Sequence, residues 1–358
     1  MSKRVFIDGA SIASLTAAAR LAKFKYEVII NGESYKNTEI DSYSFDHGAL
    51  LTLPAVYRDF FQKTGKHFGQ VLEVNPMDPA FVFQFEEIQI NFANLSRNAR
   101  LEEIESKLGK EAAAEWDKAL KQAEYIWDRI RENYVEWEFS FLKFNPDTYL
   151  RMRSPIIRNP YLHKIMANYA TYIGYPAGIY KWSHLLAFVE ESFGIWQVKG
   201  GLGALTDAIQ QRALDLGVKF GQTEDFDYFI DATQEHATPT QRLIGISNYP
   251  GELPVRTVIF HNDGLTTDIY ASKIETGKYS LILTGKLEIN DFDRYTVVDQ
   301  IRAGAEGNAD NQVITKIRTA NKRKFKVRHL DSLSHAGITG ELLANAVRGV
   351  KNRPSHEH

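Results

Sequence analysis

The first 33 residues combine two short apolar runs with a helical pattern of small residues between them. Residues 4–8 and 27–30 are apolar and partly β-branched, which is typical of buried strands. Residues 15–24 are rich in alanine and repeat apolar side chains at spacings of three and four, which indicates a helix. A strand, a tight turn, a helix and a strand within about 30 residues predict the βαβ unit that holds a dinucleotide pyrophosphate at a helix N-terminus.

The turn of this unit carries one glycine of the dinucleotide fingerprint. The pattern G-x-G-x-x-G requires glycine at positions 9, 11 and 14, and the chain has Gly9, Ser11 and Ser14. Serine is small and can donate its hydroxyl to a phosphate, although it keeps a Cβ atom. Glu33 is the candidate for the acidic residue that binds a ribose hydroxyl about 20 residues later. The unit predicts dinucleotide binding by Gly9, Ala10, Ser11, Ser14 and Glu33, with a purely structural βαβ unit as the alternative.

The middle of the chain predicts a different kind of structure. Apolar side chains at helical spacing over residues 100–138 indicate helices that cover a sheet, with a lid over an apolar site as the alternative. Alternating patterns predict a hairpin from residues 81–85 and 88–92. Further strands are expected at 255–261, 267–271, 279–284 and 313–319, and a helix at 296–305.

A basic, alternating run at residues 322–328 predicts a solvated edge strand whose charges oppose pairing with another chain. Contact of this run with phosphate or with anionic lipid at a membrane surface is the alternative.

The composition of the chain argues against several classes of functional site and partner. A chain of 358 residues allows two domains, or one domain with a large insertion. A formal net charge of −2 offers no electrostatic reason to expect nucleic acid as a partner. The absence of cysteine excludes disulfides, iron–sulfur clusters, thiolate nucleophiles and cysteine-based zinc sites. No leader pattern or long apolar window is visible, so a cytoplasmic protein is expected.

Metal and hydrolase sites are not predicted either. His261, His329 and His335 are far apart in the sequence, and no H-E-x-x-H spacing occurs. The segment from Gly9 to Ala13 lacks the second glycine of a nucleophile elbow, G-x-S-x-G.

Two later features suggest where a ligand would be contacted. Residues 194–205 combine a short strand with a glycine-rich turn that opens a helix, and residues 227–233 form a buried strand ending in small and polar side chains. A set of aromatic residues offers an apolar substrate pocket, with plain core packing as the alternative. This set comprises Tyr169, Tyr172, Tyr175, Trp182 and Trp196.

In this order, the landmarks resemble the phytoene desaturase-like branch of the flavin-dependent amine oxidase superfamily. Residues 45–54 are similar to its F-D-x-G … P segment, and residues 194–201 to its G-x-W-x-x-x-G-G turn. Residues 330–349 are similar, more weakly, to its closing motif. The resemblance is good over roughly residues 1–235 and poor over 236–326.

The resemblance implies an α/β fold: a Rossmann-like FAD- or NAD(P)-binding domain built from discontinuous segments, with an inserted α+β substrate domain of mixed or antiparallel sheet. The expected nucleotide domain comprises residues 1–75, 194–235 and 327–350. The expected substrate domain comprises 76–193 and 236–326, and residues 351–358 are expected to be a disordered tail.

The resemblance further implies FAD as the cofactor and hydride transfer to flavin from an apolar or amphipathic small molecule. The protein would position the flavin and exclude water, which explains why no catalytic acid–base pair stands out. The resemblance adds Gly48, Gly200, Gly201, Gly337 and Gly340 to the cofactor-binding set. Because several fingerprint glycines are replaced, a non-catalytic relative acting as a binding or partner protein is the alternative.

Overall fold

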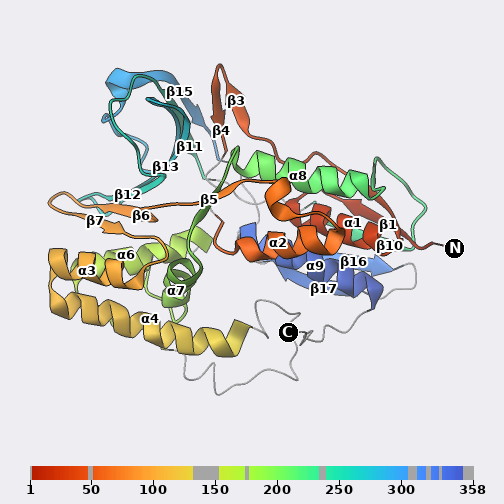
Figure 1. Ribbon diagram of the computed structural model, residues 1–358, viewed down its shortest axis with the longest axis horizontal. Coiled ribbons are helices and arrows are strands. Elements are labelled where there is room, and N and C mark those ends of the chain that lie inside the picture. Colours follow the sequence, from red (N-terminus) through yellow and green to blue (C-terminus); the bar gives the residue numbers. More distant parts are fainter. Residues whose placement is uncertain are drawn as a thin grey trace.

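The computed structural model describes residues 2–46, 51–131, 153–173, 177–233, 239–304, 313–319, 324–329 and 333–349. Two large sheets lie side by side, each with its own layer of helices (Figure 1). The predicted tail and Gly48 fall outside the described residues.

The first sheet has the strand order β17-β16-β10-β1-β2-β9. Four strands run parallel: β1 (Arg4–Asp8), β2 (Glu27–Asn31), β9 (Lys219–Phe220) and β10 (Tyr228–Asp231). The antiparallel strands β16 (Val313–Thr319) and β17 (Lys324–His329) extend the sheet beyond β10. The basic run therefore does supply an edge strand, as the alternating pattern predicts.

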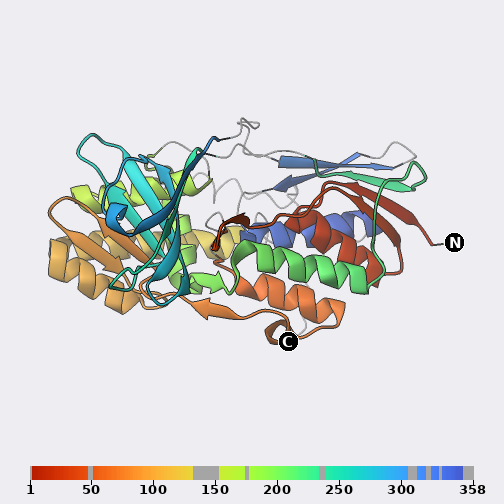
Figure 2. The same ribbon diagram turned by 90° about the horizontal axis from the view of Figure 1, so that it is seen from above.

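Four helices pack together on one side of this sheet (Figure 2). They are α1 (Ile12–Lys23), α2 (Pro54–Thr64), α8 (Gly201–Asp215) and α9 (Leu333–Arg348). The helix α1 is buried along almost its whole length, and its alanines let α8 and α9 approach closely. Strand and helix side chains form one apolar core, which includes Ile7, Leu15, Ile30 and Leu205. Burial of this core accounts for the early βαβ pattern.

The second sheet has seven strands in the order β15-β11-β14-β13-β12-β6-β7. Neighbouring strands are antiparallel except for the parallel pair β12 and β6. Their bounds are β6 (Phe81–Gln84), β7 (Gln89–Phe92), β11 (Gln241–Ile246), β12 (Arg256–Phe260), β13 (Thr266–Glu275), β14 (Lys278–Gly285) and β15 (Thr296–Arg302). The predicted hairpin is thus confirmed as β6 and β7.

Helices cover the β6–β7 end of the second sheet (Figure 1). The long helical pattern divides at Gly109, which has a φ of 90°, into α3 (Arg97–Leu108) and α4 (Lys110–Ile130). Trp116 of α4 packs edge-on against Phe92, with 5.2 Å between ring centroids, so the apolar stripe meets the sheet. The other helical segments of this layer are α6 (Pro160–Asn168), η4 (Tyr169–Ile173) and α7 (Ser183–Phe193).

One predicted element is wrong. Residues 296–302 form the edge strand β15 and not the start of a helix. Val298 and Ile301 are three residues apart, which imitates helical spacing, but only Val298 is buried. Pairing with β11, which the pattern did not reveal, decides the conformation.

Two pairs of short strands lie outside the two large sheets. The strands β5 (Val74–Pro76) and β8 (Trp196–Val198) pair with each other, as do β3 (Thr38–Ile40) and β4 (Tyr43–Phe45). Single turns of 3-10 helix occur at η1 (Phe68–Gln70) and η5 (Asp293–Tyr295). The predicted domain boundaries at 75/76 and 193/194 fall at or next to β5 and β8; the division into domains stays a prediction.

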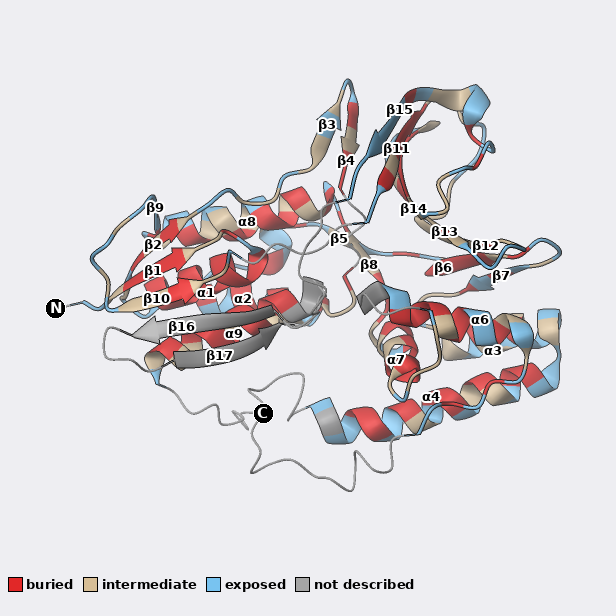
Figure 3. Ribbon diagram, turned by 180° about the vertical axis from the view of Figure 1, so that it is seen from behind, coloured by how far each residue is buried: buried red, intermediate tan, exposed pale blue. Residues whose placement is uncertain are grey.

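Buried positions concentrate in the two sheets and on the helix faces that meet them (Figure 3). Within the described ranges, no helix combines the length and apolar character needed to cross a membrane. The predicted fold class, a Rossmann-like α/β unit of discontinuous segments with a second sheet of mixed pairing, is confirmed by this architecture.

Candidate functional site

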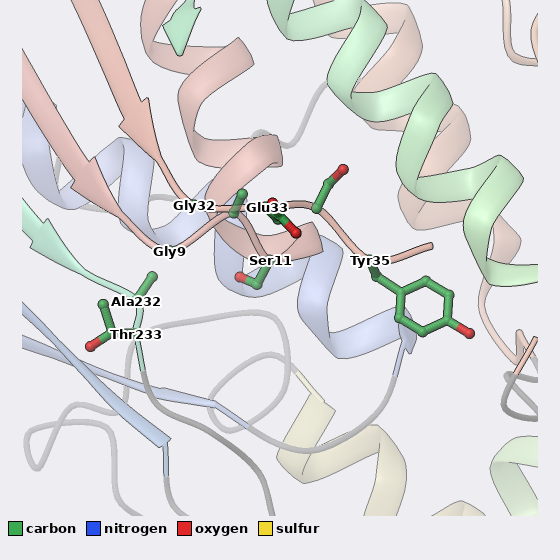
Figure 4. Close-up of a pocket in the computed structure, with 9 residues that line it drawn as sticks. Gly9, Ser11, Gly32, Glu33, Tyr35, Ala232 and Thr233 are labelled. Atoms are coloured by element: carbon green, nitrogen blue, oxygen red, sulfur yellow. The ribbon is translucent and has the colours of Figure 1, made fainter. Parts of the chain in front are cut away.

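A pocket of about 400 Å³ lies at the carboxyl ends of β1, β2 and β10. Ligands of open α/β sheets bind at this end of the strands. Figure 4 shows the residues that surround the turn after β1. The lining residues are Gly9, Ala10, Ser11, Gly32, Glu33, Ser34, Tyr35, Ala232 and Thr233. The structure therefore brings together Gly9, Ala10, Ser11 and Glu33 of the predicted cofactor set.

The floor of the pocket requires glycine at two positions. Gly9 has a φ of 106°, and a Cβ atom there would overlap the backbone carbonyl of Ala232. Gly32 has a φ of 110°, and a Cβ atom would lie 3.1 Å from the amide nitrogen of Ala10. Hydrogen bonds from the Gly9 amide to Asn31 (2.8 Å) and from the Ala232 amide to Asp8 (2.7 Å) join the three strand ends. The sequence interpretation missed Gly32, although a glycine directly after a strand was the available signal.

Ser11 is exposed at the pocket and caps α1. Its side-chain oxygen accepts a hydrogen bond of 3.2 Å from the Ser14 amide, the standard N-cap arrangement. The amides of Ile12 and Ala13, in the first turn, have no acceptor four residues earlier within the helix. This terminus carries the positive end of the helix dipole. The pocket side of the turn is therefore suited to an anion.

Ser14, by contrast, lies behind the turn and does not line the pocket. It is fully buried, and its hydroxyl donates to the Gly9 carbonyl at 2.6 Å. The two serines look equivalent in the fingerprint, but only Ser11 has its side chain at the cavity.

The rim of the pocket carries both hydrogen-bond acceptors and hydrogen-bond donors. Glu33 supplies carboxylate oxygens that accept hydrogen bonds from hydroxyls. Tyr35 contributes only part of its side chain to the rim: its ring points away from the turn after β1 (Figure 4), and burial, followed by the charge of Asp46, raises the pKa of its hydroxyl. Thr233 is oriented by a hydrogen bond of 2.8 Å to Asp231. Ser34, Tyr35 and Thr233 were missed; the small, polar end of the 227–233 strand was the only sequence signal for Thr233.

The glycine-rich turn at Gly200 and Gly201 does not line this pocket. Gly201 begins α8, and a Cβ atom there would overlap the carboxylate of Asp46, which is itself buried. The hydroxyl of Tyr270 donates to that carboxylate at 3.2 Å. Asn37 accepts the Gly203 amide hydrogen bond at 3.0 Å. The chain's own side chains therefore occupy the N-terminus of α8.

Gly337 and Gly340 also have a local structural reason to be small. A Cβ atom on Gly337 would lie 2.6 Å from Cγ1 of Val56, on α2. A Cβ atom on Gly340 would lie 2.5 Å from the carbonyl oxygen of Ala13, on α1. These glycines let α9 pack closely on two helices, and neither residue lines the pocket.

Of the aromatic residues predicted to form a substrate pocket, those that the structure describes do not all lie together. Tyr169 is buried beside Phe81, with 6.4 Å between ring centroids. Trp182 stacks on Tyr180 at 5.0 Å, and the Trp196 indole donates to the Phe193 carbonyl at 2.8 Å. Trp196 packs against the first core, whereas Trp182 packs against the second. The side chain of Tyr172, and Tyr175 as a whole, lie outside the described part of the chain.

No group of three histidine, aspartate or glutamate side chains among the described residues is placed to hold a metal ion. The pocket instead offers the carboxylate of Glu33, a group that can accept hydrogen bonds from ribose hydroxyls, and the N-terminus of α1, which can bind phosphate.

Comparison with curated proteins finds desaturases and oxygenases. The chain is 25% identical over 243 residues to 4,4'-diapolycopene oxygenase from Methylomonas sp, and 24% identical over 256 residues to a 4,4'-diapophytoene desaturase from Staphylococcus haemolyticus. It is 26% identical over 243 residues to hydroxyneurosporene desaturase from Rubrivivax gelatinosus. The predicted resemblance to phytoene desaturase-like proteins is confirmed.

The similar region has a limited extent. The three alignments cover 61%, 63% and 60% of this chain, but 48%, 49% and 46% of the relatives. The chain thus spans about half the length of the curated relatives it matches. No family model matches the sequence.

Solved structures share the fold at low identity. A protein from Pyrococcus furiosus has a TM-score of 0.58 at 12% identity, covering 98% of this chain and 99% of that one. Putrescine oxidase with bound putrescine has a TM-score of 0.55 at 11% identity, covering 98% and 99%. An oxidoreductase from Methanosarcina mazei has a TM-score of 0.53 at 10% identity, covering 86% and 89%. These similarities concern the fold alone.

Proposed function

We propose that this protein is an FAD-dependent oxidoreductase that transfers a hydride from an apolar or amphipathic small molecule to flavin. The observation that carries the proposal is the pocket at the ends of three parallel strands, built around the Gly9 turn and the N-terminus of α1. The similarity to phytoene desaturase-like flavoproteins supports the choice of FAD among dinucleotides.

The residues of the pocket fit the adenosine diphosphate half of FAD. The amides of Ile12 and Ala13 and the Ser11 hydroxyl would hold the pyrophosphate. Glu33 would accept hydrogen bonds from the adenosine ribose, while Gly9 and Gly32 let the backbone segments that form the floor of the pocket approach one another closely. When bound, FAD supplies the acceptor of the hydride, and the protein supplies binding, orientation and exclusion of water.

The names of the relatives support an apolar substrate. Diapolycopene, diapophytoene and hydroxyneurosporene are the compounds in those names, and all three are carotenoid-type molecules. For this chain we propose only the class, an apolar or amphipathic small molecule. Peripheral membrane contact through the basic strand β17 and a cytoplasmic location stay predictions from the sequence.

A non-catalytic relative acting as a binding or partner protein is the second candidate. One observation favours it: Asp46 and Asn37 occupy the glycine-rich turn of α8, where the resemblance places cofactor contact. Serines at positions 11 and 14 add to this argument.

The visible spectrum of the purified protein separates the two candidates. An oxidised-flavin spectrum that survives desalting, or that appears after incubation with FAD and removal of free cofactor, is the expected result. Bleaching of that spectrum by a carotenoid or another apolar donor without oxygen would support hydride transfer. A colourless protein that takes up no FAD would overturn the first candidate and favour the second.

A further inference from the structure

Ser14 is a polar residue that the pocket itself does not use. It lies in the first turn of α1, is fully buried, and has no place among the residues that line the cavity. Its hydroxyl oxygen lies 2.6 Å from the Gly9 carbonyl oxygen and 3.0 Å from the Ser11 carbonyl oxygen. A hydroxyl has one proton to donate, and the shorter contact identifies Gly9 as its main acceptor.

This hydrogen bond joins the end of β1 to the first turn of α1. The amide of Gly9 donates to Asn31, so with Ser14 both polar groups of the Gly9 backbone are bonded. The third fingerprint glycine normally allows close packing of helix and strand. Here the Ser14 hydroxyl donates a hydrogen bond to the Gly9 carbonyl at the end of β1, so the close packing of helix and strand is stabilised by a hydrogen bond.

Ser14 also controls the hydroxyl of Ser11. The two side-chain oxygens are 3.1 Å apart, and Ser11 already accepts the Ser14 amide hydrogen bond at 3.2 Å. Because the Ser14 proton is directed to Gly9, the Ser11 hydroxyl is the donor between the two oxygens. Ser11 is exposed at the pocket, so rotation of one hydroxyl redirects this proton from Ser14 to a bound phosphate.

We propose that Ser14 is a positioning residue for phosphate recognition, which replaces the fingerprint glycine by holding Gly9 and Ser11 in the binding arrangement. The proposal rests on the proposed function, since it assigns a role within the same nucleotide pocket. Ser14 acts through Gly9 and Ser11 and does not itself touch the ligand.

The test compares ADP with adenosine, which lacks phosphates, on the full chain with Ser14→Ala. Calorimetry or an NMR titration should show that ADP binds about fivefold more weakly, because Ser14 contacts no phosphate and acts only through the positions of Gly9 and Ser11. Adenosine affinity should change less than twofold. If the alanine variant does not fold, Ser14→Gly removes the same hydroxyl without the methyl group and should show the same selective weakening of ADP binding.

Thr206→Val is the matched control. Thr206 is a fully buried helix residue whose hydroxyl donates to the Leu202 carbonyl at 2.9 Å, and it does not line the pocket. Its loss should lower thermal stability without changing either affinity.

Three results would overturn the proposal. Equal weakening of ADP and adenosine would reduce Ser14 to a general structural role. Unchanged ADP affinity in a folded variant would show that phosphate binding at this turn does not need the Ser14 hydroxyl. The proposed function would then still stand. Wild-type protein that binds neither ADP nor FAD would remove the proposed function and this inference together.

Discussion

Two helices of this protein begin at a small-residue turn after a strand, and they differ in what lies at their N-termini. At α1 the turn from Gly9 to Ser14 opens onto a pocket, with Ser11 exposed. At α8 the turn at Gly200 and Gly201 is covered by Asp46 and Asn37 from the chain itself.

Both turns satisfy the same physical need by different means. A helix N-terminus presents unpaired amides and a partial positive charge, and an anion or a hydrogen-bond acceptor stabilises it. For α8 that partner is intramolecular and permanent. For α1 a ligand phosphate would be the partner. A glycine-rich turn before a helix is therefore insufficient to identify a cofactor site, because the deciding question is which other segment lies over it.

The largest expected effect is a loss of stability when the glycine at either turn is replaced by alanine, and the loss should differ between the two turns. Gly9→Ala should destabilise the protein by about 3 kcal/mol or more, because the φ of 106° is unfavourable and the new Cβ meets the backbone of Ala232. Gly201→Ala should cost about 2 kcal/mol, because the Asp46 carboxylate can rotate away but the Asp46 Cβ, 2.5 Å from the new atom, can yield only through a small backbone shift. Urea unfolding measures both. Equal losses of stability in the two variants would show that a clash with backbone atoms costs no more than a clash with a side chain.

Removal of the anion at α8 should produce the next largest effect. Asp46→Ala should lower the free energy of unfolding by about 2 kcal/mol, because the helix terminus loses its charge partner and the Tyr270 hydroxyl loses its acceptor. Thermal and urea unfolding provide the measurement, with Tyr270→Phe as the smaller, matched change.

ADP affinity at α1 should stay unchanged in Asp46→Ala. A new, second ADP site in this variant would show that Asp46 had blocked an anion site at α8. A variant as stable as the wild type would show that Asp46 does not stabilise that terminus.

Deleting one amide at α1 tests whether its terminus binds phosphate. Proline is tolerated at the first position of a helix, and Ser11 already has the extended conformation (φ −73°, ψ 166°) that proline requires of its predecessor. Ile12→Pro should therefore keep the helix while weakening ADP binding about tenfold, or about 1.4 kcal/mol. Ile12→Ala, which keeps the amide, controls for the lost side chain. Equal affinities of the two variants would argue against this amide as a phosphate donor.

The smallest effect concerns the cap of α1. Ser11→Ala should cost about 1 kcal/mol of stability, the usual contribution of an N-cap, and should weaken ADP binding roughly fivefold. Ser96→Ala removes the equivalent cap of α3, where Ser96 accepts the Ala99 amide at 3.3 Å. The control should show a similar loss of stability and no change in affinity. A parallel loss of ADP affinity in Ser96→Ala would mean that global stability explains the Ser11 result.

Local pattern determined much of the architecture. The apolar runs at β1 and β2, with the alanine-rich helix between them, predict the βαβ unit because burial of one face requires that spacing. The fingerprint of this unit also predicted the pocket residues Gly9, Ala10, Ser11 and Glu33, and the order of the landmarks predicted the fold class. These signals are readable because each lies within a few residues of chain.

Only the tertiary structure decided the features that depend on distant neighbours. Residues 296–302 became a strand through pairing with β11, and Gly201 became a packing position because Asp46 lies over it. Ser11 and Ser14, indistinguishable in the fingerprint, separated into a pocket residue and a buried donor to Gly9. Local periodicity records which side of an element is buried, whereas the identity of the group that covers it depends on contacts across the whole chain.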